Sequence, residues 1–388
     1  MGDIKQMLIQ LVKQEVKPAI GCTEPIAVAF AAATARKYLK SEIKSIKVKV
    51  SLNIFKNGKS VKVPGTEESG LDLAAALGVI TGNPDDGFNV FKNVDSTAVE
   101  LAHKMLHQNM ISVEPIPGCG EVYVEMFLEG NDDRVRTILS GGHTHIQRVE
   151  VNGAIVFEDR LQDAATKCED ILKALTLKDL REIAEAVDFD DIRFVLEGVE
   201  MNKSAAEMGL KKQKGLAVGA GLLKLQKEGR LCCDPSLKAR ILTAAGADFR
   251  MGGGNCPIMT SGGSGNQGLG IILPIAVIAE QIKSTEERLA RAIFFAHTIN
   301  LFVKEYTGKL SALCGCAIAA GIGASAGIAW ILGGDDVKIA GSIKNMLANL
   351  TGMICDGAKE SCALKLSTSA GEAVLAAYLA CNDVIVPE

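Results

Sequence analysis

Strand-like alternation is confined to the first part of this chain of 388 residues, and no other sequence feature limits its fold as strongly. Apolar and polar residues alternate, as they do in half-buried strands, over 46–54, 121–128, 134–139 and 146–157. From about residue 160 onward, helical spacing and glycine-rich loops replace the alternation. The sequence therefore predicts an α+β fold in which a mostly helical body carries a small inserted α+β domain.

We expect three segments along the chain. Residues 1–42 form two helices that belong to the helical body, and the second helix is apolar on nearly all sides. Residues 43–160 form the inserted domain, with helices over 72–80 and 96–109 between its strands. Residues 161–388 form the main helical domain.

A hairpin turn is predicted in the inserted domain at KNGK, residues 56–59, because Asn57-Gly58 favours a two-residue turn between strands. Val61 and Val63 would then lie on the short returning strand. A second Asn-Gly pair, inside the run 146–157, predicts another turn of the same kind.

The composition excludes several classes of protein. Apolar residues make up 48% of the chain and charged residues 23%, which is typical of a globular protein with a large core. The net charge of −4 gives no reason to expect nucleic acid or an anionic membrane as a partner. The uncharged segment 315–334 is about long enough to span a bilayer, but it is mostly Gly, Ala and Ser and has no basic flank. We therefore expect it to be a buried helix.

The N-terminus mixes charged and apolar residues at helical spacing and lacks the continuous apolar region of a signal peptide, so we expect a cytoplasmic protein. Such a chain has little use for disulfide bonds. Its eleven cysteines are therefore expected to be spare thiols, metal ligands or catalytic groups.

Cys22 is the first cysteine with a suggestive position, in GCTEP at 21–25. Thr23 can cap the helix that follows, and Pro25 suits its first turn, so Cys22 is expected at a helix N-terminus. The helix dipole would stabilise a thiolate there and lower its pKa, which suits a base or a nucleophile. A small buried residue packed beside glycine explains the same pattern equally well.

Two cysteine pairs near the C-terminus form a second candidate site. Cys314 and Cys316 lie in LCGC, and Cys355 and Cys362 form a C-x6-C pair in a glycine-containing loop. Together they could bring three thiolates to one place, as in iron–sulfur sites. Zinc is a weaker interpretation, because no histidine accompanies these loops and no C-x2-C pair occurs. Unrelated buried thiols are a third interpretation.

The segment TSGGSGNQG, residues 260–268, contains a G-x-G-x-x-G pattern before an apolar helix. A dinucleotide site would need a strand before this loop and a βαβ frame, and neither is visible. The loop better fits an anion site, where backbone N–H groups, Asn266 and Gln267 would hold a carboxylate. A glycine turn needed for close packing is the alternative.

His143 lies in a polar turn, SGGHTH at 140–145, after a predicted strand. It could carry a proton or bind a substrate, and a solvated surface histidine is an equally good interpretation.

With these motifs located, the chain resembles the L-cysteine desulfidase family, iron–sulfur relatives of bacterial L-serine dehydratase. The resemblance covers essentially the whole chain. It rests on the order and spacing of GCTEP (21–25), IFKNGKSVKVPGT (54–66), GGHTHI (141–146), TSGGSGNQG (260–268), LSALCGCA (310–317), AGIAWILGG (326–334) and ICDGAKESC (354–362).

The resemblance implies a serine-dehydratase-alpha-like helical body in which residues 161–388 form the iron–sulfur catalytic domain. In this family three cysteines hold a [4Fe–4S] cluster and leave one iron open. These match Cys314, Cys355 and Cys362, with Cys316 as the alternative to Cys314. The catalytic base matches Cys22. The substrate is expected to contact Asn57, His143, Ser261, Gly262, Gly263, Asn266 and Gln267.

The implied function is elimination of sulfide from L-cysteine, with pyruvate and ammonia as the other products and no pyridoxal phosphate. L-Serine dehydration at the same site is the first alternative. A non-catalytic iron–sulfur redox sensor is the second alternative. We expect a small-molecule substrate, no nucleic acid or membrane partner, and a chain that could form a homodimer.

Overall fold

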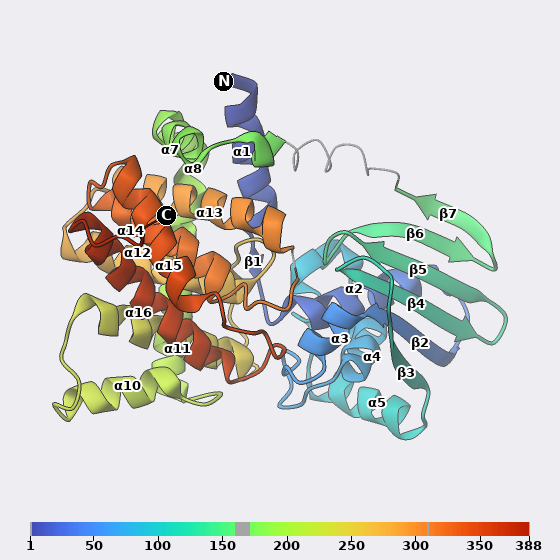
Figure 1. Cartoon of the computed structure of the whole chain (residues 1–388). Coiled ribbons are helices and arrows are strands. Elements are labelled where there is room, and N and C mark those ends of the chain that lie inside the picture. Colours follow the sequence, from blue (N-terminus) through green and yellow to red (C-terminus); the bar gives the residue numbers. More distant parts are fainter. Residues whose placement is uncertain (1, 160–170, 309, 388) are drawn as a thin grey trace.

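The computed structural model describes residues 2–159, 171–308 and 310–387, which fold into two lobes (Figure 1). One lobe is a body of helices, mostly from the C-terminal part of the chain. The other is a six-stranded sheet with helices on one face. The predicted α+β fold is confirmed.

The sheet has the strand order β3-β2-β4-β5-β6-β7. The strands are β2 (Ile43–Ser51), β3 (Ile111–Ile116), β4 (Tyr123–Gly130), β5 (Arg134–Ser140), β6 (Ile146–Val151) and β7 (Ala154–Glu158). β2 and β3 are parallel, and the other neighbouring pairs are antiparallel. The predicted strands are confirmed, although the first ends early, at Ser51. β3 was missed because Pro115 interrupts its pattern, and a sheet edge tolerates such a proline.

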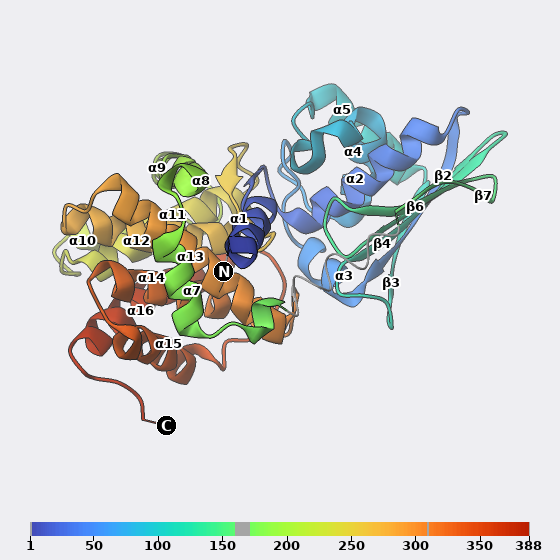
Figure 2. The ribbon, with the colours of Figure 1, turned by 90° about the horizontal axis from the view of Figure 1, so that it is seen from above.

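Three helices cover one face of the sheet and leave the other face open (Figure 2): α2 (Thr23–Tyr38), α4 (Leu71–Thr81) and α5 (Ser96–His107). The last two confirm the helices predicted in the inserted segment, and a short 3-10 helix, η1 (Pro84–Asn89), lies between them. α4 can approach α2 closely because Gly78 has no side chain. A Cβ there would lie 2.5 Å from the carbonyl oxygen of Ala29.

The predicted hairpin at residues 56–59 is wrong, because this segment ends a short helix, α3 (Leu52–Gly58). Ser51 caps the helix by accepting a hydrogen bond from the amide of Ile54 at 3.3 Å. Gly58 is needed for packing instead of for a turn, since a Cβ there would lie 2.3 Å from the side chain of Leu71. The expected Val61/Val63 strand is reduced to an isolated bridge between Lys62 and Ser69.

The two N-terminal helices pack differently. α1 (Gly2–Glu15) contributes apolar side chains to the core of the helical body, whereas α2 belongs to the core beneath the sheet. Between them, β1 (Pro18–Ala19) pairs with β8 (Ile258–Met259), the short strand of the helical body. The expected domain boundaries stay a prediction, and the packing of α2 favours a first boundary near residue 20 instead of residue 42.

The helical body consists of α7 (Leu177–Ala186), α8 (Phe189–Ile192), η2 (Arg193–Leu196), α9 (Glu197–Lys212), α10 (Val218–Lys227), α11 (Pro235–Met251), α12 (Gly265–Gln281), α13 (Glu286–Thr307), α14 (Ile318–Ile331), α15 (Asp336–Leu350) and α16 (Cys362–Cys381). α14 packs closely on α13 because Gly323 and Gly327 face backbone carbonyls. A Cβ at these positions would lie 2.6 Å and 2.9 Å from the carbonyl oxygens of Ala296 and Ala292.

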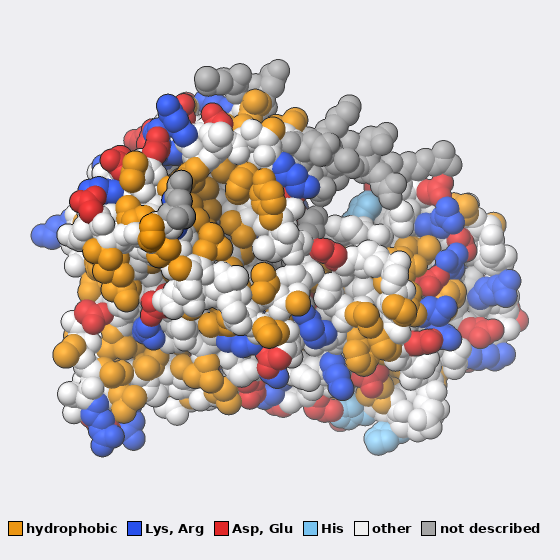
Figure 3. Space-filling view, viewed as in Figure 1, with side chains coloured by type: hydrophobic (Ala, Val, Ile, Leu, Met, Phe, Trp, Pro, Cys, Tyr) orange, Lys and Arg blue, Asp and Glu red, His pale blue; other side chains and the backbone are white. Residues whose placement is uncertain are grey.

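The uncharged segment 315–334 is largely α14, which is buried as predicted. In the described parts of the chain, no helix combines the length and the apolar character needed to cross a membrane. On the face shown in Figure 3, hydrophobic side chains gather over the helical body, whereas charged side chains of both signs are mixed over the sheet lobe.

Candidate active site

A cavity where the two lobes meet brings together most of the predicted site residues. Its lining includes Cys22, Asn57, His143, Gly262, Gly263, Asn266, Gln267, Cys314, Cys355 and Cys362. These residues come from the start of α2, from α3, from the turn after β5 and from the two C-terminal cysteine segments. The others belong to the glycine-rich segment 260–268, called the glycine loop below. Ser261 is the exception, because it is fully buried and is not part of the cavity lining.

Cys22 is the N-cap residue of α2, as expected for a helix N-terminus, but its side chain makes no capping bond. The thiol is 2% exposed and lies 3.6 Å from the sulfur of Met251. Burial raises the pKa of Cys22 to about 12, although the nearby Arg250 guanidinium lowers it. The predicted fall in pKa is therefore wrong, because the loss of hydration outweighs the stabilisation of a thiolate at a helix start.

Thr23 does not cap α2, contrary to the expectation from the sequence. It is the first residue of the helix, and its hydroxyl donates to the Glu24 carboxylate at 3.3 Å. The second carboxylate oxygen of Glu24 accepts a hydrogen bond from the Asn57 amide at 3.0 Å. The Cys355 thiol in turn lies 3.9 Å from the Asn57 amide oxygen. Asn57 thus connects α2 with the C-terminal cysteine loop.

Arg250, which the sequence analysis missed, is a buried cation at the end of α11. Its Nη1 donates to the Asn266 amide oxygen at 2.9 Å and also lies 3.5 Å from the sulfur of Met251. Its Nε is buried without a hydrogen-bond partner among the described residues. An arginine beside a glycine run carries no sequence signal of burial, so only the packing of α11 against the loop identifies it.

The glycine loop leads into α12 at Gly265, and Ser264, Asn266 and Gln267 at the start of this helix line the cavity. Gly262 and Gly263 have φ angles of 53° and 73°, which favour glycine. The predicted anion site is consistent with this geometry. The G-x-G-x-x-G pattern follows only the two-residue strand β8, and β8 pairs antiparallel with β1, so no βαβ frame surrounds the loop.

Three polar residues on one face of α13 hold the glycine loop from behind. The ring of His297 lies 2.8 Å from the Ser261 hydroxyl oxygen through Nδ1. The Asn300 amide donates to Ser261 at 3.0 Å and to Gln267 at 2.9 Å. Lys304 donates to the carbonyl of Gly262. Their spacing of three and four residues, within and just after the apolar stretch of α13, was the signal that could have identified them.

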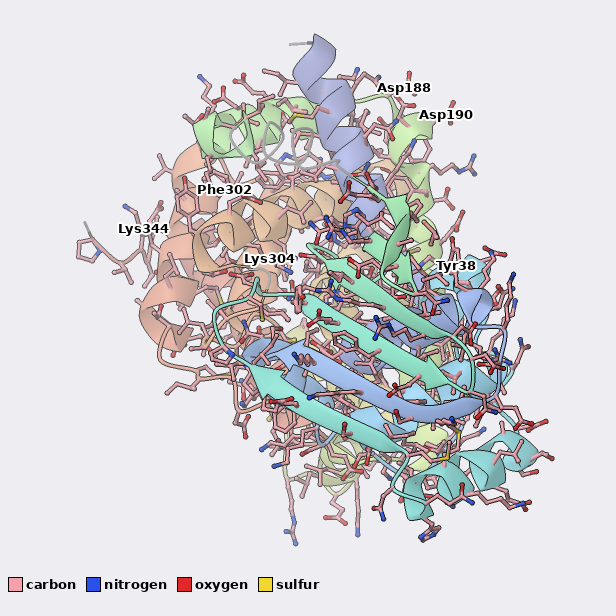
Figure 4. All side chains as sticks on the ribbon, turned by 90° about the vertical axis from the view of Figure 1, so that its right-hand side faces the viewer. Tyr38, Asp188, Asp190, Phe302, Lys304 and Lys344 are labelled. Atoms are coloured by element: carbon pink, nitrogen blue, oxygen red, sulfur yellow. The ribbon has the colours of Figure 1, made fainter. Side chains whose placement is uncertain are left out.

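His297 is uncharged in this network. Complete burial lowers its pKa to about 3, so the ring is neutral near neutral pH. Lys304 lies at the junction of the helical body and the sheet lobe (Figure 4). His143 also lines the cavity; it is 8% exposed and close enough to Gly263 that a Cβ there would lie 3.5 Å from its Nδ1. His143 is therefore not a solvated surface histidine.

Besides Cys22, four cysteines line the cavity: Cys314, Cys316, Cys355 and Cys362. The Cys316 thiol hydrogen-bonds to Cys314, which lowers the pKa of Cys314 to about 7 and raises that of Cys316. Burial, together with the charges of Cys314 and Cys355, raises the pKa of Cys362 to about 11. The four sulfurs are thus close enough to influence one another.

The thiol-rich donor set suits an iron–sulfur cluster, whose irons are commonly held by cysteine thiolates. Among the described residues, no three His, Cys, Asp or Glu side chains are arranged around one metal position. A [4Fe–4S] cluster instead spreads its thiolate ligands around several irons. Cys314, Cys355 and Cys362 could hold it, and Cys316, which donates to Cys314 and lies 3.8 Å from the Ser264 hydroxyl, is placed as a neighbour of that ligand set.

Comparison with known proteins identifies the family of this chain. Residues 85–387 match the serine dehydratase alpha chain family. Three bacterial relatives carry the name UPF0597 protein. The one from Clostridium botulinum is 59% identical over 386 residues, which is 99% of this chain and 89% of the relative. Those from Alkaliphilus oremlandii and Clostridioides difficile are 42% and 41% identical, over 99% and 98% of this chain and 90% of each relative. The chain therefore belongs to the serine dehydratase alpha chain family, whose members are lyases.

Proposed function

We propose that this protein is an L-cysteine desulfidase, which eliminates sulfide from L-cysteine. The observation that carries the proposal is the single cavity in which the Cys22 thiol, the Arg250 guanidinium and the glycine loop face three candidate cluster ligands. Such a cavity offers a base, an anion site and a metal site to one small substrate.

The glycine loop and Arg250 would bind the substrate carboxylate. Backbone N–H groups at the start of α12 and a buried guanidinium both favour a carboxylate over a neutral group. Asn266, which accepts from Arg250, joins these two parts of the anion site. Fixing the carboxylate orients the Cα–H bond toward one wall of the cavity, which is how positioning assists the reaction.

Cys22 would remove the Cα proton. Its thiol must first lose its own proton to solvent water, and Arg250 is the neighbouring group that favours the thiolate. A thiolate with a high pKa is a strong base, which suits the weakly acidic Cα–H bond. The electron pair left on Cα then forms the Cα–Cβ double bond as the Cβ–S bond breaks.

Cys314, Cys355 and Cys362 would hold a [4Fe–4S] cluster, with Cys316 as the alternative to Cys314. When bound, a cluster with one iron free of protein ligands supplies a Lewis acid for the leaving sulfur. The organic product, 2-aminoacrylate, tautomerises and takes up water. In total, L-cysteine and water give pyruvate, ammonia and hydrogen sulfide.

L-Serine dehydration is the second candidate function. The family's description as serine dehydratase favours it. The two reactions share the proton abstraction and the organic product and differ only in the leaving group. The thiol-rich lining does not discriminate between them, so the substrate must be decided by assay.

The test is turnover by the protein purified without oxygen, with L-cysteine and L-serine supplied separately and in competition. We expect sulfide and pyruvate in equal amounts from L-cysteine, with a higher kcat/KM than for L-serine. Pyruvate from L-serine alone would replace the proposed function by serine dehydration. A protein that binds iron and sulfide but converts neither amino acid would instead support the redox-sensor alternative.

A further inference from the structure

Glu24 and Arg250 place opposite charges in the same cavity. Their side chains are 6% and 3% exposed, and both line the cavity. In the part of the chain that the structure describes, the hydrogen-bond partners of both are neutral groups. Glu24 accepts from Asn57 and Thr23. Arg250 donates to Asn266 and Met251, and its other side-chain partner is the Cys22 thiol.

Burying a charge is unfavourable unless an opposite charge accompanies it. Two opposite charges that share a cavity without pairing are therefore complementary to a ligand that carries both charges and fits between them. An α-amino acid is such a ligand, because it is a zwitterion at neutral pH. Arg250 and the glycine loop account for its carboxylate, which leaves its ammonium group to Glu24.

We propose that Glu24 binds the α-ammonium group of the substrate and so selects α-amino acids over analogues that lack this group. The inference rests on the proposed function only in that the ligand is an α-amino acid, and it holds for L-cysteine and L-serine alike.

The Glu24 carboxylate is held in place for this role. Each of its oxygens accepts one hydrogen bond from the protein, at 3.0 Å from the Asn57 amide and at 3.3 Å from the Thr23 hydroxyl. A carboxylate oxygen can accept a second hydrogen bond, so both remain able to receive an ammonium proton. Its position in the first turn of α2 also stabilises its negative charge.

A purely structural role is the competing explanation, because Glu24 also positions Asn57 beside Cys355. The two roles differ in which ligands they affect. Loss of an ammonium site weakens only ligands that carry an ammonium group, whereas a disturbed cavity weakens every ligand.

Two analogues, each of which keeps part of L-cysteine, distinguish these roles in a binding measurement that needs no turnover. Cysteamine keeps the ammonium group and the thiol but lacks the carboxylate, and 3-mercaptopropionate keeps the carboxylate and the thiol but lacks the ammonium group. Binding of each is measured by calorimetry without oxygen, on the iron-loaded wild type, Glu24→Gln, Glu24→Asp and Glu280→Gln. Glu280 is an exposed carboxylate that pairs with Lys238, so its variant controls for the loss of one negative charge.

We expect Glu24→Gln to weaken cysteamine binding by about 10- to 100-fold, the scale of one hydrogen bond to a charged group, and to leave 3-mercaptopropionate within about twofold of the wild type. Glu24→Asp, which keeps the charge, should restore much of the cysteamine affinity. Glu280→Gln should bind both ligands as the wild type does.

Equal weakening of both ligands in Glu24→Gln would overturn the inference in favour of a structural role. Unchanged cysteamine binding, or a wild type that binds neither half, would also overturn it. If Glu24→Gln does not fold, the inference is tested on Glu24→Asp. Its shortened carboxylate must then weaken the binding of cysteamine more than the binding of 3-mercaptopropionate. Failure of the proposed function is recognised separately, because it is read from sulfide release and not from these affinities.

Discussion

Leu313 and Ile354 form an isolated antiparallel bridge between two loops that are distant in the sequence. On one side of the bridge, the amide of Cys314 donates to the carbonyl of Met353 at 2.9 Å, and on the other the amide of Cys355 donates to that of Ala312 at 2.7 Å. The bridge therefore fixes the backbones of two candidate cluster ligands relative to each other.

The first prediction concerns the proposed cluster ligands. Serine at Cys355 or Cys362 should remove bound iron and sulfide together with activity, because a hydroxyl is a poor replacement for a thiolate ligand. At the doublet, Cys314→Ser should lose the cluster and Cys316→Ser should keep it. Iron content and the visible absorption spectrum of anaerobic protein measure both. Full iron content in Cys355→Ser and Cys362→Ser would refute the ligand set, and the reverse result at the doublet would assign the ligand to Cys316.

The role of Cys22 makes the second prediction. Cys22→Ser should retain the cluster spectrum but lose turnover by at least ~10²-fold, the usual effect of removing a positioned acid–base group. Exchange of the substrate's Cα proton with deuterium, followed by NMR, tests the proton step itself. Normal exchange in the variant would exclude Cys22 as the base. An altered cluster spectrum before substrate is added would instead identify it as a cluster ligand.

The support of the glycine loop makes the third prediction. Asn300→Ala removes the hydrogen bonds to Ser261 and Gln267, so the loop should hold the substrate carboxylate less well. We expect KM to rise about 10-fold, the scale of one or two hydrogen bonds, while the iron content stays normal. Asn349→Ala is the control, because Asn349 bonds to Glu372 on the surface of the helical body. An unchanged KM in Asn300→Ala would show that the loop keeps its shape without this contact.

The buried carboxylate of Asp248 makes the fourth prediction. Asp248 accepts a hydrogen bond from the amide of Gly219 at 2.9 Å, near the start of α10, and burial raises its pKa to about 6. Because the folded-state pKa lies above the ordinary value of 3.8, folding disfavours the ionised form. The contribution of Asp248 to stability is therefore fully present below about pH 4 and is lost as the pH rises through about 6.

Asp248→Asn, which cannot ionise, should consequently be more stable than the wild type at about pH 8, by up to about 3 kcal/mol at about 1.4 kcal/mol per pKa unit. The difference should shrink toward pH 4. Urea unfolding of both proteins at several pH values measures it. A stability difference that does not vary with pH would mean that the substitution acts through the hydrogen bond to Gly219 and not through the charge.

Local patterns in the sequence determined the secondary structure wherever one short-range rule acted alone. The alternation over 121–128, 134–139 and 146–157 predicted three strand regions, because a sheet with one buried face requires a period of two. The wrong hairpin prediction at Asn57-Gly58 came from relying on such a local rule. The pair favours a turn locally, but the buried Ile54 and the contact of Gly58 with Leu71 stabilise a helix there.

The sequence also determined which short segments are candidate parts of the site, since cysteines and glycine-rich segments can be recognised directly by residue type. The tertiary structure decided how these segments meet. It buried Ser261 outside the cavity lining, and it brought Arg250 and Asn300 to the site from helices with no motif. It also reversed the expected pKa shift of Cys22. Burial is a property of all surrounding elements together, and no window of sequence around residue 22 contains it.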